Sequence, residues 1–156
     1  MRVLSMILTL STVALFSLQC AGANPLRKAK KGAKEVPYVT LKNYYVRNDV
    51  DCRRTQQLVI DSEKEFEKYF GAAAIMGSAP TDIDWKRQFV IAILLPETNK
   101  PTMVTPMKVK QSPGNVIFYY QVNIGHKTSH RLVPFAAIAL ERSADAQQMQ
   151  VYYIEE

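Results

Sequence analysis

Apolar and polar residues follow a short β-type pattern in seven stretches of the chain. In the last of them, Met149, Val151 and Tyr153 alternate with Gln150 and Tyr152, which is typical of a half-buried strand. The third stretch is apolar throughout, which predicts a strand buried on both faces and therefore central in its sheet. The seven predicted strands are Pro37–Arg47, Gln57–Ile60, Phe89–Leu95, Met103–Lys110, Val116–Val122, Ser129–Leu140 and Gln148–Ile154.

Prolines qualify two of these strands. Pro106 lies inside the stretch that begins at Met103, and a proline in a strand favours a sheet edge or a bulge. Pro134 interrupts the stretch that begins at Ser129.

One segment has helical spacing instead. Ser62 and Glu65 form a capping-box pattern, in which each side chain satisfies a backbone N–H at the helix start. Phe66 and Phe70 lie one helical turn apart and would share an apolar face that packs into the core. Gly71 is placed to end the helix in a left-handed conformation. We therefore predict one short helix from Ser62 to Phe70.

These elements predict an α+β fold. The short connections imply mainly antiparallel pairing, so we expect a sheet of about seven strands, open or barrel-like, with one short helix. No internal repeat is present, and residues 37–156 are expected to form a single β-rich domain.

The first 23 residues have the pattern of a secretory signal peptide. Arg2 is followed by an apolar run from Met6 to Leu18 and then by Ala21-Gly22-Ala23, a small-x-small cleavage site. The run is shorter than the roughly 20 residues needed to span a bilayer. We therefore expect an exported protein, in the periplasm, at the outer membrane or outside the cell.

The two cysteines leave two forms of processing open. Cleavage after Ala23 would remove Cys20 and leave Cys52 as a lone thiol, most commonly a buried one. In the alternative, the chain is a lipoprotein that is cut before Cys20 and lipidated there, which would tether it to a membrane. Cys20 follows the apolar run directly, although Gln19 stands where a small residue is expected. Both forms exclude a disulfide between the two cysteines.

Charge is concentrated near the N-terminus. The formal net charge is +6. Residues 37–156 contain 14 basic and 13 acidic side chains, so a nucleic-acid-binding domain is not indicated. Residues 24–36 contain five basic side chains and one acid without an evident apolar period, and we interpret them as a flexible basic arm. The arm is either a solvated tether or a segment that binds an anionic polymer or membrane in an envelope structural or adhesive protein.

Residue types needed for catalysis are scarce. His126 and His130 are the only histidines, and Ser129 would point to the opposite face of a strand from His130. The chain has no zinc-type Cys/His spacing and no glycine-rich phosphate loop. We therefore predict no catalytic residue, no metal and no cofactor.

A succession of motifs resembles a known family. It runs from Leu58-Val59-Ile60 and Glu65-Phe66 through Asp82-Ile83-Asp84-Trp85 to Phe89-Val90-Ile91-Ala92. This order, over roughly residues 55–155, resembles the C-terminal domain of the PrcB family of protease-complex subunits, and small exported proteinase inhibitors of the Bacteroidetes. The resemblance implies a non-enzymatic protein that holds a protease and either stabilises or inhibits it. Where the family often has a Gly-Gly-Tyr-like step, this chain has Asn99-Lys100-Pro101-Thr102.

Two loops are the predicted contact sites for such a partner. The first is Glu97-Thr98-Asn99-Lys100, which is bracketed by prolines and would lose little entropy on docking. The second is the connection from Ala72 to Pro80, with Ile75 and Met76. Either loop could instead be an ordinary connector, and we expect a monomer in the absence of the partner.

Overall fold

The computed structural model describes residues 24–73, 77–142 and 149–156. The predicted signal peptide, the alternative lipidation site Cys20 and the predicted contact residues Ile75 and Met76 lie outside these residues. No helix among the described residues has the length and apolar content needed to cross a membrane.

The described residues form two short helices and ten strands in three sheets. The helices are α1 (Pro25–Lys30) and α2 (Glu63–Phe66). The strands are β1 (Lys34–Val36), β2 (Val39–Thr40), β3 (Tyr44–Val46), β4 (Gln56–Ile60), β5 (Phe70–Ala72), β6 (Gln88–Leu94), β7 (Thr102–Ser112), β8 (Asn115–Ile124), β9 (Phe135–Glu141) and β10 (Gln150–Glu155).

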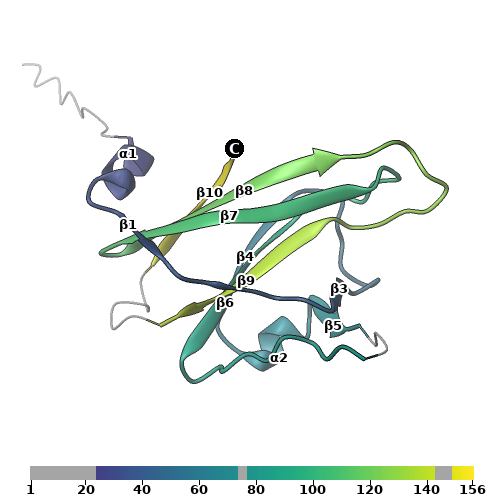
Figure 1. The fold of residues 1–156 in the computed structure, drawn as a ribbon, viewed down its shortest axis with the longest axis horizontal. Coiled ribbons are helices and arrows are strands. Elements are labelled where there is room, and N and C mark those ends of the chain that lie inside the picture. Colours follow the sequence, from purple (N-terminus) through teal and green to yellow (C-terminus); the bar gives the residue numbers. More distant parts are fainter. Residues whose placement is uncertain (1–23, 74–76, 143–148) are drawn as a thin grey trace, which may run out of the picture.

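The first sheet has the strand order β1-β7-β8-β10, and the second sheet has the order β2-β9-β6-β4. They face each other as two layers, and the small β3–β5 sheet lies with α2 on the far side of the second sheet (Figure 1). Side chains from β6 and β8, among them Ile91, Ile93 and Phe118, are fully buried between the two large sheets. This inter-layer core holds the two sheets together.

The second sheet also has a core on its other face. Phe66 of α2 stacks on Phe70 of β5, with ring centroids 4.8 Å apart, and its ring lies 5.1 Å from that of Tyr44 of β3. Val90 and Leu94 of β6 are fully buried in this second core. Since β6 also pairs with β4 and β9, the prediction of a central strand buried on both faces is confirmed.

The predicted β-rich fold with mainly antiparallel pairing is thus confirmed in outline. The prediction of about seven strands in one sheet with a single helix was wrong, because the described residues form ten strands in three sheets and two helices. The predicted strand Pro37–Arg47 divides in two, because β2 pairs with β9 of the second sheet whereas β3 pairs with β5. Asn43 makes the change of direction with a left-handed φ of 62°. The pairing of β10 with β8 is parallel.

The predicted helix from Ser62 to Phe70 is shorter than expected. Ser62 caps α2 as predicted, its Oγ accepting a hydrogen bond from the Glu65 N–H at 3.4 Å, but the helix ends at Phe66. Gly71 is therefore not a helix cap. It lies opposite Tyr45 in the β3–β5 pair, and a Cβ at Gly71 would come within 2.5 Å of the Tyr45 ring. Strand pairing with β3 outweighs the local helical pattern here.

The proline predictions agree with the strands. The β7–β8 pairing has an irregularity between Pro106 and Lys108, where a bulge or edge was predicted. After Pro134, β9 begins at Phe135, so Ser129 and His130 lie in a loop and not in the strand predicted for them.

Residues 24–36, interpreted from the sequence as a flexible arm, are folded onto the first sheet. Leu26, Ala29 and Ala33 follow a spacing of three and four residues, a short apolar face that the sequence interpretation missed. Ala29 is fully buried, and the Oγ of Ser112 in β7 donates a hydrogen bond to its carbonyl at 3.1 Å. After the helix, β1 pairs with β7.

Candidate functional site

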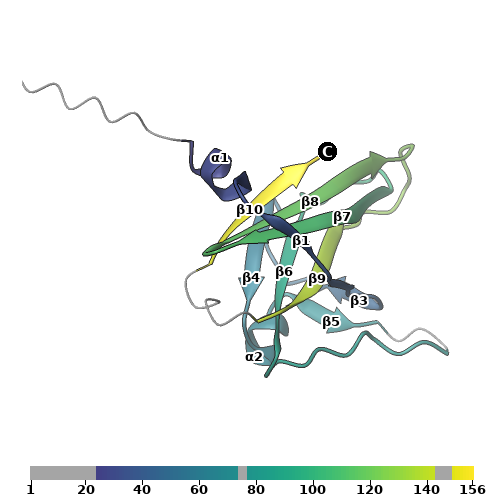
Figure 2. The same ribbon diagram turned by 60° about the vertical axis from the view of Figure 1, so that its left-hand side comes forward.

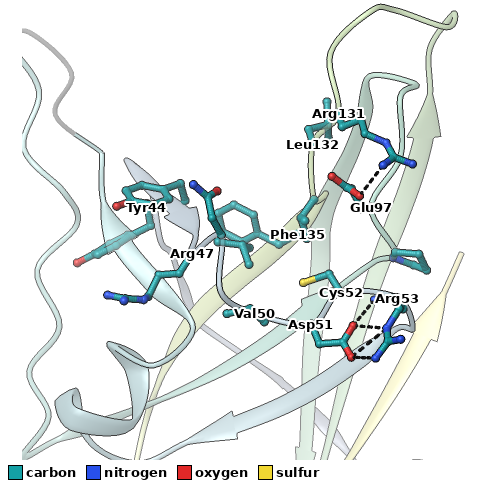
Figure 3. Close-up of a pocket in the computed structure, with 15 residues that line it drawn as sticks. Tyr44, Arg47, Val50, Asp51, Cys52, Arg53, Glu97, Arg131, Leu132 and Phe135 are labelled. Atoms are coloured by element: carbon teal, nitrogen blue, oxygen red, sulfur yellow. Dashed lines mark hydrogen bonds and ion pairs between the residues drawn. The ribbon is translucent and has the colours of Figure 1, made fainter.

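A pocket of about 700 Å³ opens where three segments meet at one end of the molecule. These segments are the stretch from Tyr44 to Arg53, the start of the β6–β7 loop at Pro96 and Glu97, and residues 131–135 before and at the start of β9. Figure 3 shows aromatic and aliphatic side chains, including Tyr44 and Phe135, along the pocket, with charged groups at its rim. Such a mixture suits the binding of a side chain or peptide segment.

Two ion pairs neutralise charges at the rim (Figure 3). Arg53 donates two hydrogen bonds from Nε, at 2.8 and 3.1 Å, and one from Nη2, at 2.5 Å, to the carboxylate of Asp51. These bonds lower the pKa of Asp51 to about 2. Arg131 lies 3.4 Å from Glu97, between Nη1 and Oε2. These four charges at the rim therefore largely cancel in pairs.

Cys52 lines the pocket, and its side chain is a potential nucleophile. The thiol is free and buried. Burial raises the pKa of Cys52, and the charges of Asp51 and Glu97 raise it further. Because the thiolate is the reactive form, this environment makes the thiol a weak nucleophile. Cys52 also serves structurally, since its carbonyl accepts the N–H of Glu97 at 3.0 Å.

The predicted contact loop Glu97-Thr98-Asn99-Lys100 borders this pocket and is tied to the β8–β9 loop. Thr98 and Leu132 exchange two main-chain hydrogen bonds of 2.9 Å each. The Thr128 N–H donates to the Asn99 carbonyl at 2.7 Å. Glu97 and Lys100 are exposed, whereas Thr98 and Asn99 are partly buried. Two loops thus form one ordered unit, which we call the loop end.

Exposed apolar side chains stand beside the loop end. Met103 is 67% and Ile124 is 66% exposed, near the paired ends of β7 and β8. Tyr45 at the pocket is 49% exposed. Sequence reasoning missed all three, because it placed Met103 and Tyr45 in ordinary strands and left Ile124 between two predicted strands.

The histidines do not join the pocket. His126 and His130 are exposed in the β8–β9 loop, and neither is among the residues that line the cavity. Within the described ranges, no three His, Cys, Asp or Glu side chains gather in a way that could hold a metal ion.

Comparison of the chain with family models, with characterised proteins and with solved structures gave no match. The resemblance to PrcB-like subunits therefore stays a prediction.

Proposed function

We propose that this chain is an exported, non-enzymatic protein that binds an extracytoplasmic protease through its loop end, as an inhibitor or an accessory subunit. The observation that carries the proposal is the ordered pair of loops, in which Thr98, Asn99 and Pro101 are hydrogen-bonded to Leu132, Thr128 and Gly125.

An ordered loop favours binding for an entropic reason. A mobile loop must be immobilised when it docks, whereas a loop already held by main-chain hydrogen bonds has lost that freedom in the free protein. The Gly125 N–H donates to the Pro101 carbonyl at 2.6 Å, so the far end of the loop is held as well. Less of the free energy of contact is then lost in ordering the loop, so the affinity is higher.

Exposed side chains near the loop end and in the pocket are of the kinds found in protein interfaces. Met103 and Ile124 lie at the paired ends of β7 and β8, and Tyr45 lines the pocket. A partner can remove them from water, and methionine and tyrosine are enriched in interface cores. The charged residues Glu97 and Lys100 would lie at the rim of such a contact. The protease as partner class depends on the family resemblance and on the predicted export.

The proposal is tested with proteases purified from the exported fraction of the host. Their activity and thermal inactivation are measured with and without the protein, together with the affinity of the pair. The test variant is Lys100→Ala with Met103→Ala. The matched control is Lys64→Ala with Met107→Ala, which truncates another exposed lysine and an exposed methionine away from the loop end.

We expect the native protein and the control to bind one protease and to change its activity or its lifetime. The Lys100→Ala/Met103→Ala variant should lose at least about tenfold in affinity, mainly through Met103, because central apolar side chains carry most of the binding energy and a rim charge such as Lys100 carries little. Equal affinities of the two double variants would place the contact elsewhere. Hydrolysis by the protein itself, removed by His126→Ala with His130→Ala, would show an enzyme instead.

A further inference from the structure

Four basic side chains, three on α1 and one on the residue that follows it, are exposed, and we call them the basic helix patch. They are Arg27, Lys28, Lys30 and Lys31. Lys34 is also exposed, but it shares a face of β1 with Val36, which packs into the core between the sheets, so it is not counted in the patch. Among the described residues, six ion pairs within 4.0 Å are formed, and none of them involves the patch. Several basic residues of the body, such as Arg53 and Arg142, are by contrast paired with a carboxylate. The patch therefore has positive charge that is not neutralised locally.

The patch has a firm support. Ala29 packs with Ile117 and Tyr119 of β8, and Ala33 adds to the same cluster. Since helix neighbours differ by about 100° in direction, the side chains of residues 27, 28, 30 and 31 lie away from the buried Ala29. The fold thus presents these charges together on the outer side of the first sheet.

We propose that the basic helix patch docks the protein on a bilayer surface that contains anionic phospholipid. The charge is complementary to such a surface, and each lysine or arginine near it strengthens binding about fivefold. None of the patch residues lines the pocket at the loop end or the two other pockets, which lie beside Arg54 and Trp85. An exposed row of cations instead fits a flat array of headgroups.

The place of the patch in the chain favours a membrane over a soluble polyanion. α1 begins at Pro25, directly after the predicted leader. On export, the patch would therefore be the part of the mature chain that emerges beside the membrane. Membrane docking does not depend on the proposed protease contact.

Docking at the patch would leave the loop end at a distance from the membrane contact. α1 and the loop end lie at opposite ends of the first sheet in both ribbon views (Figures 1 and 2). β8 runs between these ends over 10 residues, which corresponds to roughly 30 Å. The docked helix would therefore not cover the loop end.

The test uses the protein with its natural leader, recovered from an exporting host, and its mature N-terminus is determined by mass spectrometry. Partitioning is measured by sedimentation with vesicles of phosphatidylcholine alone and with vesicles that also contain phosphatidylglycerol, an anionic phospholipid. The test variant is Lys28→Gln, Lys30→Gln and Lys31→Gln. The control removes the same charge elsewhere, by Lys64→Gln, Lys68→Gln and Lys86→Gln.

We expect the native protein and the control to bind the anionic vesicles, with the test variant weakened roughly 100-fold from the factor of about five per charge. Binding should fall steeply when salt rises from about 0.1 to 0.5 M. A lipid on Cys20 would strengthen all three proteins equally and leave this ratio unchanged. Equal partitioning of the two triple variants, or binding to heparin or duplex DNA but not to anionic vesicles, would overturn the proposal.

Discussion

A single hydroxyl group joins the edges of the two large sheets. Tyr153 of β10 donates a hydrogen bond of 2.7 Å to the carbonyl of Leu58 in β4. Its ring lies 5.9 Å from that of Phe118 in an edge-on arrangement. Burial raises the pKa of Tyr153. The folded state therefore favours the neutral phenol, which can donate this hydrogen bond. Through that bond, the protonation of one side chain affects the stability of both sheets.

Substitution of Tyr153 by phenylalanine should test this connection. The hydrogen bond would be lost, and we expect a decrease of about 1 kcal/mol in the free energy of unfolding at pH 7. The folded pKa of Tyr153 lies above the unfolded value of about 10. Its contribution is therefore complete below pH 10 and is lost as the pH rises through the folded pKa. Urea unfolding at several values between about pH 7 and 11 measures both effects.

The pH series has a clear opposing outcome. The phenylalanine variant should lose less stability than the native protein between neutral and alkaline pH. An alkaline loss of the same size in both proteins would show that the buried phenol does not couple folding to pH.

At the scale of elements, the docking of α1 determines whether the basic residues form a patch or a mobile tail. The helix has only six residues and could not persist alone in water. Its contacts are Ala29 against Ile117 and Tyr119, together with the hydrogen bond from Ser112. Packing against the first sheet therefore stabilises the helix.

The variant Ala29→Asp should detach α1 and leave the sandwich folded. A carboxylate at this fully buried position would lack a partner, so undocking is less costly than burial. We expect hydrogen exchange to rise over residues 26–33 and to stay slow in β6, with a loss of about 1–2 kcal/mol in global stability. Lys28→Asp, at an exposed position of the same helix, is the control and should leave the exchange pattern in place. Unchanged exchange in Ala29→Asp would contradict the docked position of the helix.

At the scale of the whole molecule, the second sheet belongs to two cores. Ile91 and Ile93 of β6 face the first sheet, whereas Val90 and Leu94 face α2 and the β3–β5 sheet. Neither core can lose its packing without exposing one face of the same strand. The layers are therefore expected to unfold together, in one cooperative transition.

Phe66→Ala and Phe118→Ala should test this coupling, since they remove one large side chain from each core. Phe66 is 5% exposed and Phe118 is fully buried, so each truncation should cost about 3–5 kcal/mol. We expect both variants to keep a single transition in urea, with near-ultraviolet and far-ultraviolet circular dichroism coinciding. A separate early transition in Phe66→Ala alone would show that α2 and the β3–β5 sheet form an independent unit.

The candidate site was predictable only in part. The loop Glu97–Lys100 was predicted as a partner contact from its prolines; the structure places its first residue, Glu97, in the pocket lining, and its role as a contact stays a prediction. Arg131, Leu132 and Phe135 come from a segment more than 30 residues away, and no local pattern indicates that they meet Glu97. Met103 and Ile124 likewise look like ordinary strand and turn residues, because their exposure depends on where the facing sheet ends.

The sequence by itself determined what depends on neighbours along the chain. The positions of most strands, the Ser62 cap, the irregularity at Pro106 and the buried central strand follow from periodicity and from the backbone limits of individual residues. The tertiary structure alone decided that Phe70 and Gly71 enter a strand, and that residues 24–36 fold onto the first sheet. Both outcomes depend on pairing and burial against distant segments. Such contacts add enough free energy to outweigh a weak local preference, and their partners are not encoded in any short window of residues.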